Sequence, residues 1–220
     1  MTRVKICGIR EEAHALAAAE AGADFVGLVF ASSKRQVTPA QAEKIAAAVK
    51  QSGHATEVVG LFVNISTTVV NKTAEFCHLD WVQLSGDESW EYCREINRPI
   101  IKVVRVSRRQ SPQEIGDILA HGARILDDQK HVYLLDAKVK GRYGGTGTTF
   151  NWSLARQVVE KFPVVIAGGL TPENVARAIK IAAPWGVDIS SGVEVDKVKH
   201  VARIRAFIKA VRRAGDENQR

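Results

Sequence analysis

The sequence predicts an α/β protein that folds as a single (β/α)8 barrel, the TIM-barrel architecture, and three observations support this prediction. Short apolar runs alternate with longer stretches of helical periodicity from one end of the chain to the other. Eight such pairs follow one another, each roughly 25 residues long, which suits a closed barrel better than an open sheet. The runs are apolar on both faces, as is typical of parallel strands covered by helices.

The predicted strands and helices follow in chain order. The strands are the runs Val4–Cys7, Phe25–Phe30, Glu57–Val63, Trp81–Leu84, Ile100–Val106, Val132–Asp136, Val164–Ala167 and Val187–Ser190. The helices are predicted to begin near Arg10, Thr38, Ser66, Glu88, Ser111, Asn151, Thr171 and Lys197. Three of these starts, Thr38-Pro39, Ser111-Pro112 and Thr171-Pro172, place a capping hydroxyl before a proline at the first helical position.

The alternative fold is an open flavodoxin-like or Rossmann sheet, but no GxGxxG motif follows the first run. A chain of 220 residues fits one barrel domain, which we expect to span residues 1–214, with a frayed polar tail at 215–220. The longest connection without periodicity, 137–149, is rich in glycine. A loop of this kind is either a mobile lid or a sign that the assignment is wrong there.

The composition is that of a soluble globular protein, with 45% hydrophobic and 25% charged residues. No apolar run approaches the ~18 to 20 residues of a membrane span, and the first residues lack a signal-peptide stretch, so a cytoplasmic protein without membrane contact is expected. The three cysteines form no CxxC pair and have no histidine at metal-ligand spacing. Neither disulfides nor a metal site are therefore predicted.

The formal net charge of +7 is compatible with nucleic acid, an acidic membrane surface or an anionic substrate. Much of the excess lies in residues 197–213, where basic side chains interleave with apolar ones at helical spacing. The solvated face of an amphipathic helix explains this pattern better than a nucleic-acid surface does. No nucleic-acid partner is therefore expected.

Active sites of such barrels lie where the strands end, and two of these ends are rich in glycine and serine. Gly168 and Gly169 follow the seventh strand, and Ser190, Ser191 and Gly192 follow the eighth. Loops after these two strands, with a short extra helix, form the recurrent phosphate site of many barrels. Backbone N–H groups there can approach an anion closely, although tight turns without a ligand would have the same composition.

Two further strand ends carry groups able to transfer protons. Cys7 ends the first strand, where a thiol is either a buried apolar group or, with its pKa lowered by helix N-termini or Arg35, a reactive thiolate. Asp136 ends the sixth strand, where a carboxyl group is either a structural ion-pair partner or an acid/base catalyst. The residues alone leave both alternatives open.

Taken together, these segments resemble the phosphoribosylanthranilate isomerases of tryptophan biosynthesis, over nearly the whole chain. The matching stretches are Lys5-Ile6-Cys7-Gly8-Ile9, Gly27-Leu28-Val29-Phe30, Ser33-Lys34-Arg35, Gly60-Leu61-Phe62-Val63-Asn64, Val82-Gln83-Leu84, Leu134-Leu135-Asp136-Ala137-Lys138, Gly144-Gly145-Thr146-Gly147, Phe150-Asn151-Trp152, Ala167-Gly168-Gly169-Leu170-Thr171-Pro172-Glu173-Asn174 and Asp188-Ile189-Ser190-Ser191-Gly192-Val193-Glu194. Each is weak alone, but their common order along the chain is specific.

The resemblance implies a cofactor-free Amadori rearrangement of N-(5-phosphoribosyl)anthranilate to 1-(2-carboxyphenylamino)-1-deoxyribulose 5-phosphate. It further implies that Asp136 is the general acid and Cys7 the general base. The carboxyl pKa must then be raised and the thiol pKa lowered, with Arg35 and backbone dipoles favouring the thiolate. By the same resemblance, Arg35 pairs with the anthranilate carboxylate, Gln83 and Gly145 contact the substrate, and the segment 144–147 closes over it.

Two departures from the family pattern stand out. Ser85 stands where the family usually has histidine, and the stretch after Glu194 reads Val195-Asp196-Lys197-Val198-Lys199-His200 in place of a Gly-Lys-Asp segment. The approach to the last helix is therefore expected to be rebuilt. The oligomeric state, monomer or homodimer, does not follow from the sequence.

Rival interpretations are a histidine-pathway isomerase, an indole-glycerol-phosphate or thiamine-phosphate synthase, and an inactive phosphate-metabolite binding protein. The histidine-pathway enzymes carry acidic residues at the ends of the first and fifth strands, where this chain has Cys7 and Arg105. An inactive protein would have no need to keep both Cys7 and Asp136.

Overall fold

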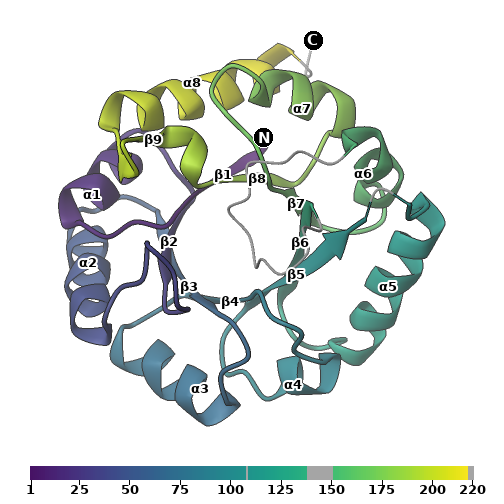
Figure 1. The fold of residues 1–220 in the computed structure, drawn as a ribbon, viewed down its shortest axis with the longest axis horizontal. Helices are drawn as coiled ribbons and strands as arrows, with labels where there is room; N and C mark the ends of the chain where they lie inside the picture. Colours follow the sequence, from purple (N-terminus) through teal and green to yellow (C-terminus); the bar gives the residue numbers. More distant parts are fainter. Residues whose placement is uncertain (108, 138–150, 218–220) are drawn as a thin grey trace.

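The computed structural model describes residues 1–107, 109–137 and 151–217. Within these ranges, eight parallel strands close into one barrel, each hydrogen-bonded to the next and β8 to β1, and helices surround it (Figure 1). The strands are β1 (Arg3–Cys7), β2 (Phe25–Val29), β3 (Glu57–Phe62), β4 (Trp81–Leu84), β5 (Ile100–Val106), β6 (His131–Ala137), β7 (Val164–Ile166) and β8 (Gly186–Ile189). The predicted barrel is confirmed, with several strands ending one residue earlier than expected.

The helices of the outer ring alternate with the strands along the chain. They are α1 (Glu12–Glu20), α2 (Pro39–Gln51), α3 (Thr67–Phe76), α4 (Trp90–Arg94), α5 (Pro112–Ile125), α6 (Trp152–Val159), α7 (Val175–Ala182) and α8 (Val201–Glu217). The last helix runs to Glu217, so residues 215–217, expected in the tail, are helical. Among the described residues, no helix is both long and apolar enough to cross a membrane.

Two of the three predicted proline starts are confirmed by their hydrogen bonds. The Thr38 hydroxyl accepts from the backbone N–H of Gln41 at the start of α2. Ser111 and Glu114 form a reciprocal capping box at the start of α5. Such caps satisfy backbone donors that have no partner inside the helix, which is why these local signals located the starts of α2 and α5.

Two helices start later than predicted, and both follow the glycine-rich loops after β7 and β8. The helix predicted near Thr171 begins at Val175, because Thr171 opens a turn in which the Asn174 side chain accepts from its N–H. The helix predicted near Lys197 begins at Val201, because an antiparallel hairpin of β9 (Glu194–Val195) and β10 (Val198–Lys199) precedes it. A 3-10 turn, η1 (Ser191–Val193), links β8 to this hairpin.

The barrel has two apolar regions, one inside the strands and one outside them. The inner cluster contains Phe25, Val59, Trp81, Ile101, Val103, Val132, Leu134, Val165 and Ala167. The larger outer cluster lies between the strands and the helices. Since side chains alternate across a strand, the strands β2 to β7 contribute to both regions, whereas β1 and β8 contribute no residue to the inner cluster. The inner cluster closes the amino-terminal part of the barrel and leaves a cavity at the carboxyl ends of the strands.

Candidate active site

A cavity of about 760 Å³ opens at the carboxyl ends of the strands. Nine of the ten residues predicted for the site line it: Cys7, Arg35, Gln83, Asp136, Gly168, Gly169, Ser190, Ser191 and Gly192. The tenth, Gly145, lies outside the described residues, as does the rest of the segment 144–147. Strand ends that are far apart in sequence therefore converge on one cavity large enough for a phosphorylated metabolite.

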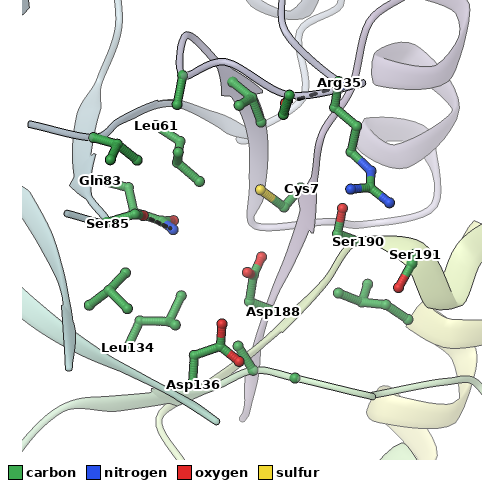
Figure 2. A pocket seen from close by; sticks show the side chains of 18 of the residues that line it. Cys7, Arg35, Leu61, Gln83, Ser85, Leu134, Asp136, Asp188, Ser190 and Ser191 are labelled. Atoms are coloured by element: carbon green, nitrogen blue, oxygen red, sulfur yellow. Dashed lines mark hydrogen bonds between the residues drawn. The ribbon is translucent and has the colours of Figure 1, made fainter. Parts of the chain in front are cut away.

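Cys7 and Asp136 face this cavity from β1 and β6, with the Asp188 side chain between them in the view of Figure 2. Asp136 is 9% exposed, and its Oδ1 accepts a hydrogen bond of 2.8 Å from the Ala137 N–H. The pKa of Asp136 is raised to about 6; burial is the largest cause and Asp188 also raises it, while the Ala137 N–H and Arg105 act in the opposite direction. The carboxyl group thus keeps its proton far more readily than an ordinary aspartate.

The pKa of the Cys7 thiol is shifted in the direction opposite to the one expected. Burial raises the pKa of this thiol, whereas the role of general base implied by the family resemblance needs a pKa lowered by Arg35 and backbone dipoles. The Lys5 ammonium has the largest opposing effect, followed by Lys199. The expectation failed because the thiol lies deep in the barrel, at 5% exposure, where desolvation disfavours the thiolate. All three cysteines are buried free thiols.

Arg35 reaches the cavity edge over Gly8. A Cβ atom at Gly8, whose φ is +79°, would lie 2.5 Å from the Arg35 Cδ, so only glycine admits the arginine chain there. The guanidinium forms two hydrogen bonds with Glu194, from Nε to Oε1 at 2.6 Å and from Nη2 to Oε2 at 2.8 Å. One edge of the arginine is therefore already paired inside the protein.

The two glycine-rich loops lie directly against each other. A side chain at Gly192 would collide with the carbonyl oxygen of Leu170, so the loops pack together only because this residue is glycine. Gly168 and Gly169 adopt φ values of +85° and +62°, a conformation that favours glycine. The Asn174 amide donates to the Gly169 carbonyl at 2.9 Å and holds this turn. Residues of both loops line the cavity.

Gln83 and Ser85 lie on the opposite side of the cavity, at the end of β4 (Figure 2). Both are buried, and the Gln83 Nε2 donates to the Ser85 Oγ at 3.1 Å. The Gln83 Oε1 is buried without a hydrogen-bond partner among the described residues. A buried acceptor of this kind costs free energy unless a ligand supplies the missing donor.

Comparison with known proteins identifies the family. The family model for N-(5'-phosphoribosyl)anthranilate (PRA) isomerase matches residues 4–210. The N-(5'-phosphoribosyl)anthranilate isomerase of Dehalococcoides mccartyi is 46% identical over 214 residues, which cover 97% of each chain. The chain belongs to the phosphoribosylanthranilate isomerase family.

Solved structures agree with this assignment. The phosphoribosylanthranilate isomerase of Thermotoga maritima superimposes with a TM-score of 0.83 at 37% identity, covering 96% of this chain and 99% of the other. A second family structure, in complex with reduced 1-(o-carboxyphenylamino)-1-deoxyribulose 5-phosphate, has a TM-score of 0.80 at 35% identity with the same coverage. The resemblance drawn from the sequence is thus confirmed over nearly the whole chain.

The stretch after Glu194 forms part of the hairpin β9–β10, which precedes the last helix. Asp196 and Lys197 form its turn with φ values of +50° and +67°, which are uncommon for residues other than glycine. The hairpin places Lys199 beside the loop after β8, where its Nζ lies 2.8 Å from the Ser190 carbonyl and 2.7 Å from the Glu194 Oε1. That the approach to the last helix is rebuilt relative to the family stays a prediction.

Four residues of the site were not assigned roles from the sequence: Lys5, Asp188, Glu194 and Lys199. Lys5 and Asp188 form a buried ion pair of 2.9 Å beneath the cavity. The available signal was a pair of opposite charges within two otherwise apolar strands that adjoin when the barrel closes. Glu194 and Lys199 gave no comparable signal, because their partners depend on the geometry of the hairpin.

Proposed function

We propose that this chain catalyses the Amadori rearrangement of N-(5-phosphoribosyl)anthranilate to 1-(2-carboxyphenylamino)-1-deoxyribulose 5-phosphate, a step of tryptophan biosynthesis. Membership of the isomerase family supports the reaction. The observation that carries the proposal for this chain is the placement of Cys7 and Asp136 on one cavity, with the carboxyl pKa raised to about 6. One group that donates a proton and one that accepts a proton are what the reaction requires.

In the proposed mechanism Asp136 is the general acid. Its carboxyl group donates a proton to the furanose ring oxygen, the bond from this oxygen to C1 of the sugar breaks, and the ring opens to a Schiff base. The Cys7 thiolate then removes the proton from C2, which gives an enolamine that tautomerises to the ketone. The raised pKa of Asp136 keeps a useful fraction of the acid form near neutral pH.

The substrate contacts are also proposals. The backbone N–H groups of Gly168, Gly169, Ser190, Ser191 and Gly192 bind the phosphate, which the close packing of the two loops supports. The free edge of Arg35 pairs with the anthranilate carboxylate.

On the other side of the cavity, the unpartnered Gln83 Oε1 accepts a hydrogen bond from the substrate. Gly145 is proposed as a further contact from the family resemblance. The enzyme requires no cofactor, and works as a monomer or a homodimer, which light scattering distinguishes.

The decisive experiment is conversion of freshly prepared phosphoribosylanthranilate by the purified protein, and the loss of substrate fluorescence measures its rate. The Asp136→Asn variant, purified in parallel, controls for isomerase carried over from the expression host. Turnover by the wild-type protein well above this control is expected. Equal rates in the two preparations would show that the proposed function is wrong.

A further inference from the structure

A buried ion pair lies inside the barrel beneath the cavity. The Lys5 Nζ lies 2.9 Å from the Asp188 Oδ1, and the two side chains are only 2% and 10% exposed. Taking two charges out of water costs several kcal/mol, and apolar side chains of similar volume are often as stable or more stable at such positions. Stability alone therefore does not explain this pair, and its neighbours indicate what it does.

The lysine lies against the proposed base. Lys5 and Cys7 are two residues apart on β1, so both side chains point into the barrel. A Cβ atom on Gly27 of β2 would lie 3.0 Å from the Cys7 Sγ and 3.1 Å from the Lys5 Nζ. The missing side chain of Gly27 thus leaves room for the thiol and the ammonium over the same residue. A positive charge at this place favours the thiolate.

The aspartate lies on the side of the proposed acid. Asp188, on β8, lines the cavity between Cys7 and Asp136 in the view of Figure 2. Two carboxyl groups close together in a buried site resist simultaneous ionisation, so the charge of one keeps the proton on the other. Because the Asp188 carboxylate is already paired with the Lys5 ammonium at 2.9 Å, the resistance to ionisation falls on Asp136.

We propose that the Lys5–Asp188 ion pair is a positioning pair that directs the protons of the two catalytic groups, its ammonium favouring the thiolate of Cys7 and its carboxylate favouring the neutral acid of Asp136. Neither residue exchanges a proton with substrate in this scheme. The inference deepens the proposed function and rests on it for the roles of Cys7 and Asp136. One ion pair then acts on two groups in the opposite directions that acid and base catalysis need.

The electrostatics of the site agree with this assignment. Burial raises the pKa of Cys7, and Lys5 opposes the effect more strongly than any other cation around it. Burial also raises the pKa of Asp136, and Asp188 raises it further. Burial alone would lower the pKa of Lys5, but Asp188 and Cys7 together raise it above the ordinary value, so the amine stays charged. Asp188 itself raises the pKa of Cys7, an effect smaller than that of Lys5, and the other charged groups near the thiol are Lys199 from β10 and Arg35 from the loop after β2.

The test is the pH dependence of Cys7 alkylation by iodoacetamide in the full-length protein, since this rate follows the thiolate fraction and needs no isomerase activity. The Cys7→Ala variant supplies the background from Cys77 and Cys93. The variants compared with wild type are Lys5→Met, Asp188→Asn and the double variant, which buries no charge at this place. Lys199 and Arg35 remain in all of them.

The expected shifts have opposite signs. Lys5→Met raises the alkylation pKa by about one unit or more, a roughly tenfold loss of thiolate at a given pH, and Asp188→Asn lowers it. A purely structural pair would give changes of the same sign in both variants, and such a result, or unchanged profiles, would overturn the proposal. If Lys5→Met does not fold, the double variant replaces it, and its pKa is expected to lie above that of Asp188→Asn.

A second measurement follows Asp136 directly. The carboxyl resonance of Asp136, observed by ¹³C NMR in protein labelled at aspartate, is expected to titrate at a lower pH in Asp188→Asn than in wild type. An unchanged titration would remove Asp188 from the proposal. Both measurements keep their meaning if the conversion assay fails, so failure of the proposed function and failure of the ion-pair inference are distinguishable.

Discussion

Glu194 accepts two hydrogen bonds from the guanidinium of Arg35, at 2.6 Å from Nε and 2.8 Å from Nη2. The pair joins the loop after β2, where Arg35 lines the cavity, to the hairpin after β8. It occupies one edge of the planar guanidinium and leaves Nη1 and one N–H of Nη2 for a ligand. Glu194 thereby orients the arginine before any substrate binds.

Arg35→Lys is expected to weaken substrate binding more than it slows the chemical step. An ammonium cannot bond Glu194 through two parallel N–H groups and present a second planar edge to a carboxylate. We expect KM to rise roughly tenfold, with a smaller change in kcat, because the loss of one bidentate charged contact amounts to about 1.5 kcal/mol. Steady-state kinetics measure this split, with exposed Arg94→Lys as the matched control. An unchanged KM would remove Arg35 from substrate recognition.

The pH profile of kcat/KM is expected to rise to a plateau with its acidic limb near pH 6. Below this pH Asp136 is already protonated, so the rate follows the thiolate of Cys7 and falls tenfold for each unit. Above it the thiolate fraction still rises while the neutral Asp136 fraction falls equally, and the two effects cancel up to the raised pKa of the thiol. Rates measured from pH 5 to 9 test this, and a limb near pH 4 would contradict the raised carboxyl pKa.

Asp136→Asn is expected to stabilise the protein at pH 8 while reducing kcat by at least about 100-fold. The folded carboxyl has a pKa of about 6 against an ordinary 3.8, so the folded state binds more protons and wild-type stability falls as the pH rises between these values. The amide removes this penalty, which amounts to about 1–3 kcal/mol at pH 8 and nothing near pH 3.

Urea unfolding at the two pH values measures this difference. The exposed Asp127→Asn is the control, and its stability is expected to change little at either pH. An Asp136→Asn variant less stable than wild type at pH 8 would show that the ionised carboxylate stabilises the folded state, as a structural partner does, and does not destabilise it.

Residues at the strand ends could be predicted from the sequence. Local apolar runs show where each strand ends, and the barrel brings all strand ends together, which is how Cys7, Asp136 and Gly168 were found. The caps at Thr38 and Ser111 were found because each is complete within four residues. These features depend on residues close together in the sequence, so one sequence is enough to predict them.

The pairs that prepare the site could not be found in the same way. Lys5 and Asp188 are 183 residues apart, and Arg35 and Glu194 are 159 apart. The raised pKa of Cys7 depends on how deeply the barrel buries it, which no local pattern reports. The late start of α7 depends on Asn174 turning its side chain back to Thr171 and Gly169 in place of continuing a regular helix.

Gly192→Ala is expected to impair phosphate binding, and Gly116→Ala is its matched control. The added methyl at position 192 would collide with the Leu170 carbonyl and approach the Ile189 Cδ1 to 2.9 Å, so the two phosphate loops must separate. We expect a rise in KM, weaker competition by inorganic phosphate and a loss of about 1–3 kcal/mol in stability.

At Gly116, in α5, the nearest side-chain atom would lie 3.9 Å away, and alanine is expected to stabilise the helix by about 0.5–1 kcal/mol. Inhibition by phosphate and thermal unfolding of both variants measure these effects. Because the control adds the same methyl group without touching the loops, a Gly192→Ala enzyme with wild-type KM would show that the loop contact has no part in binding phosphate.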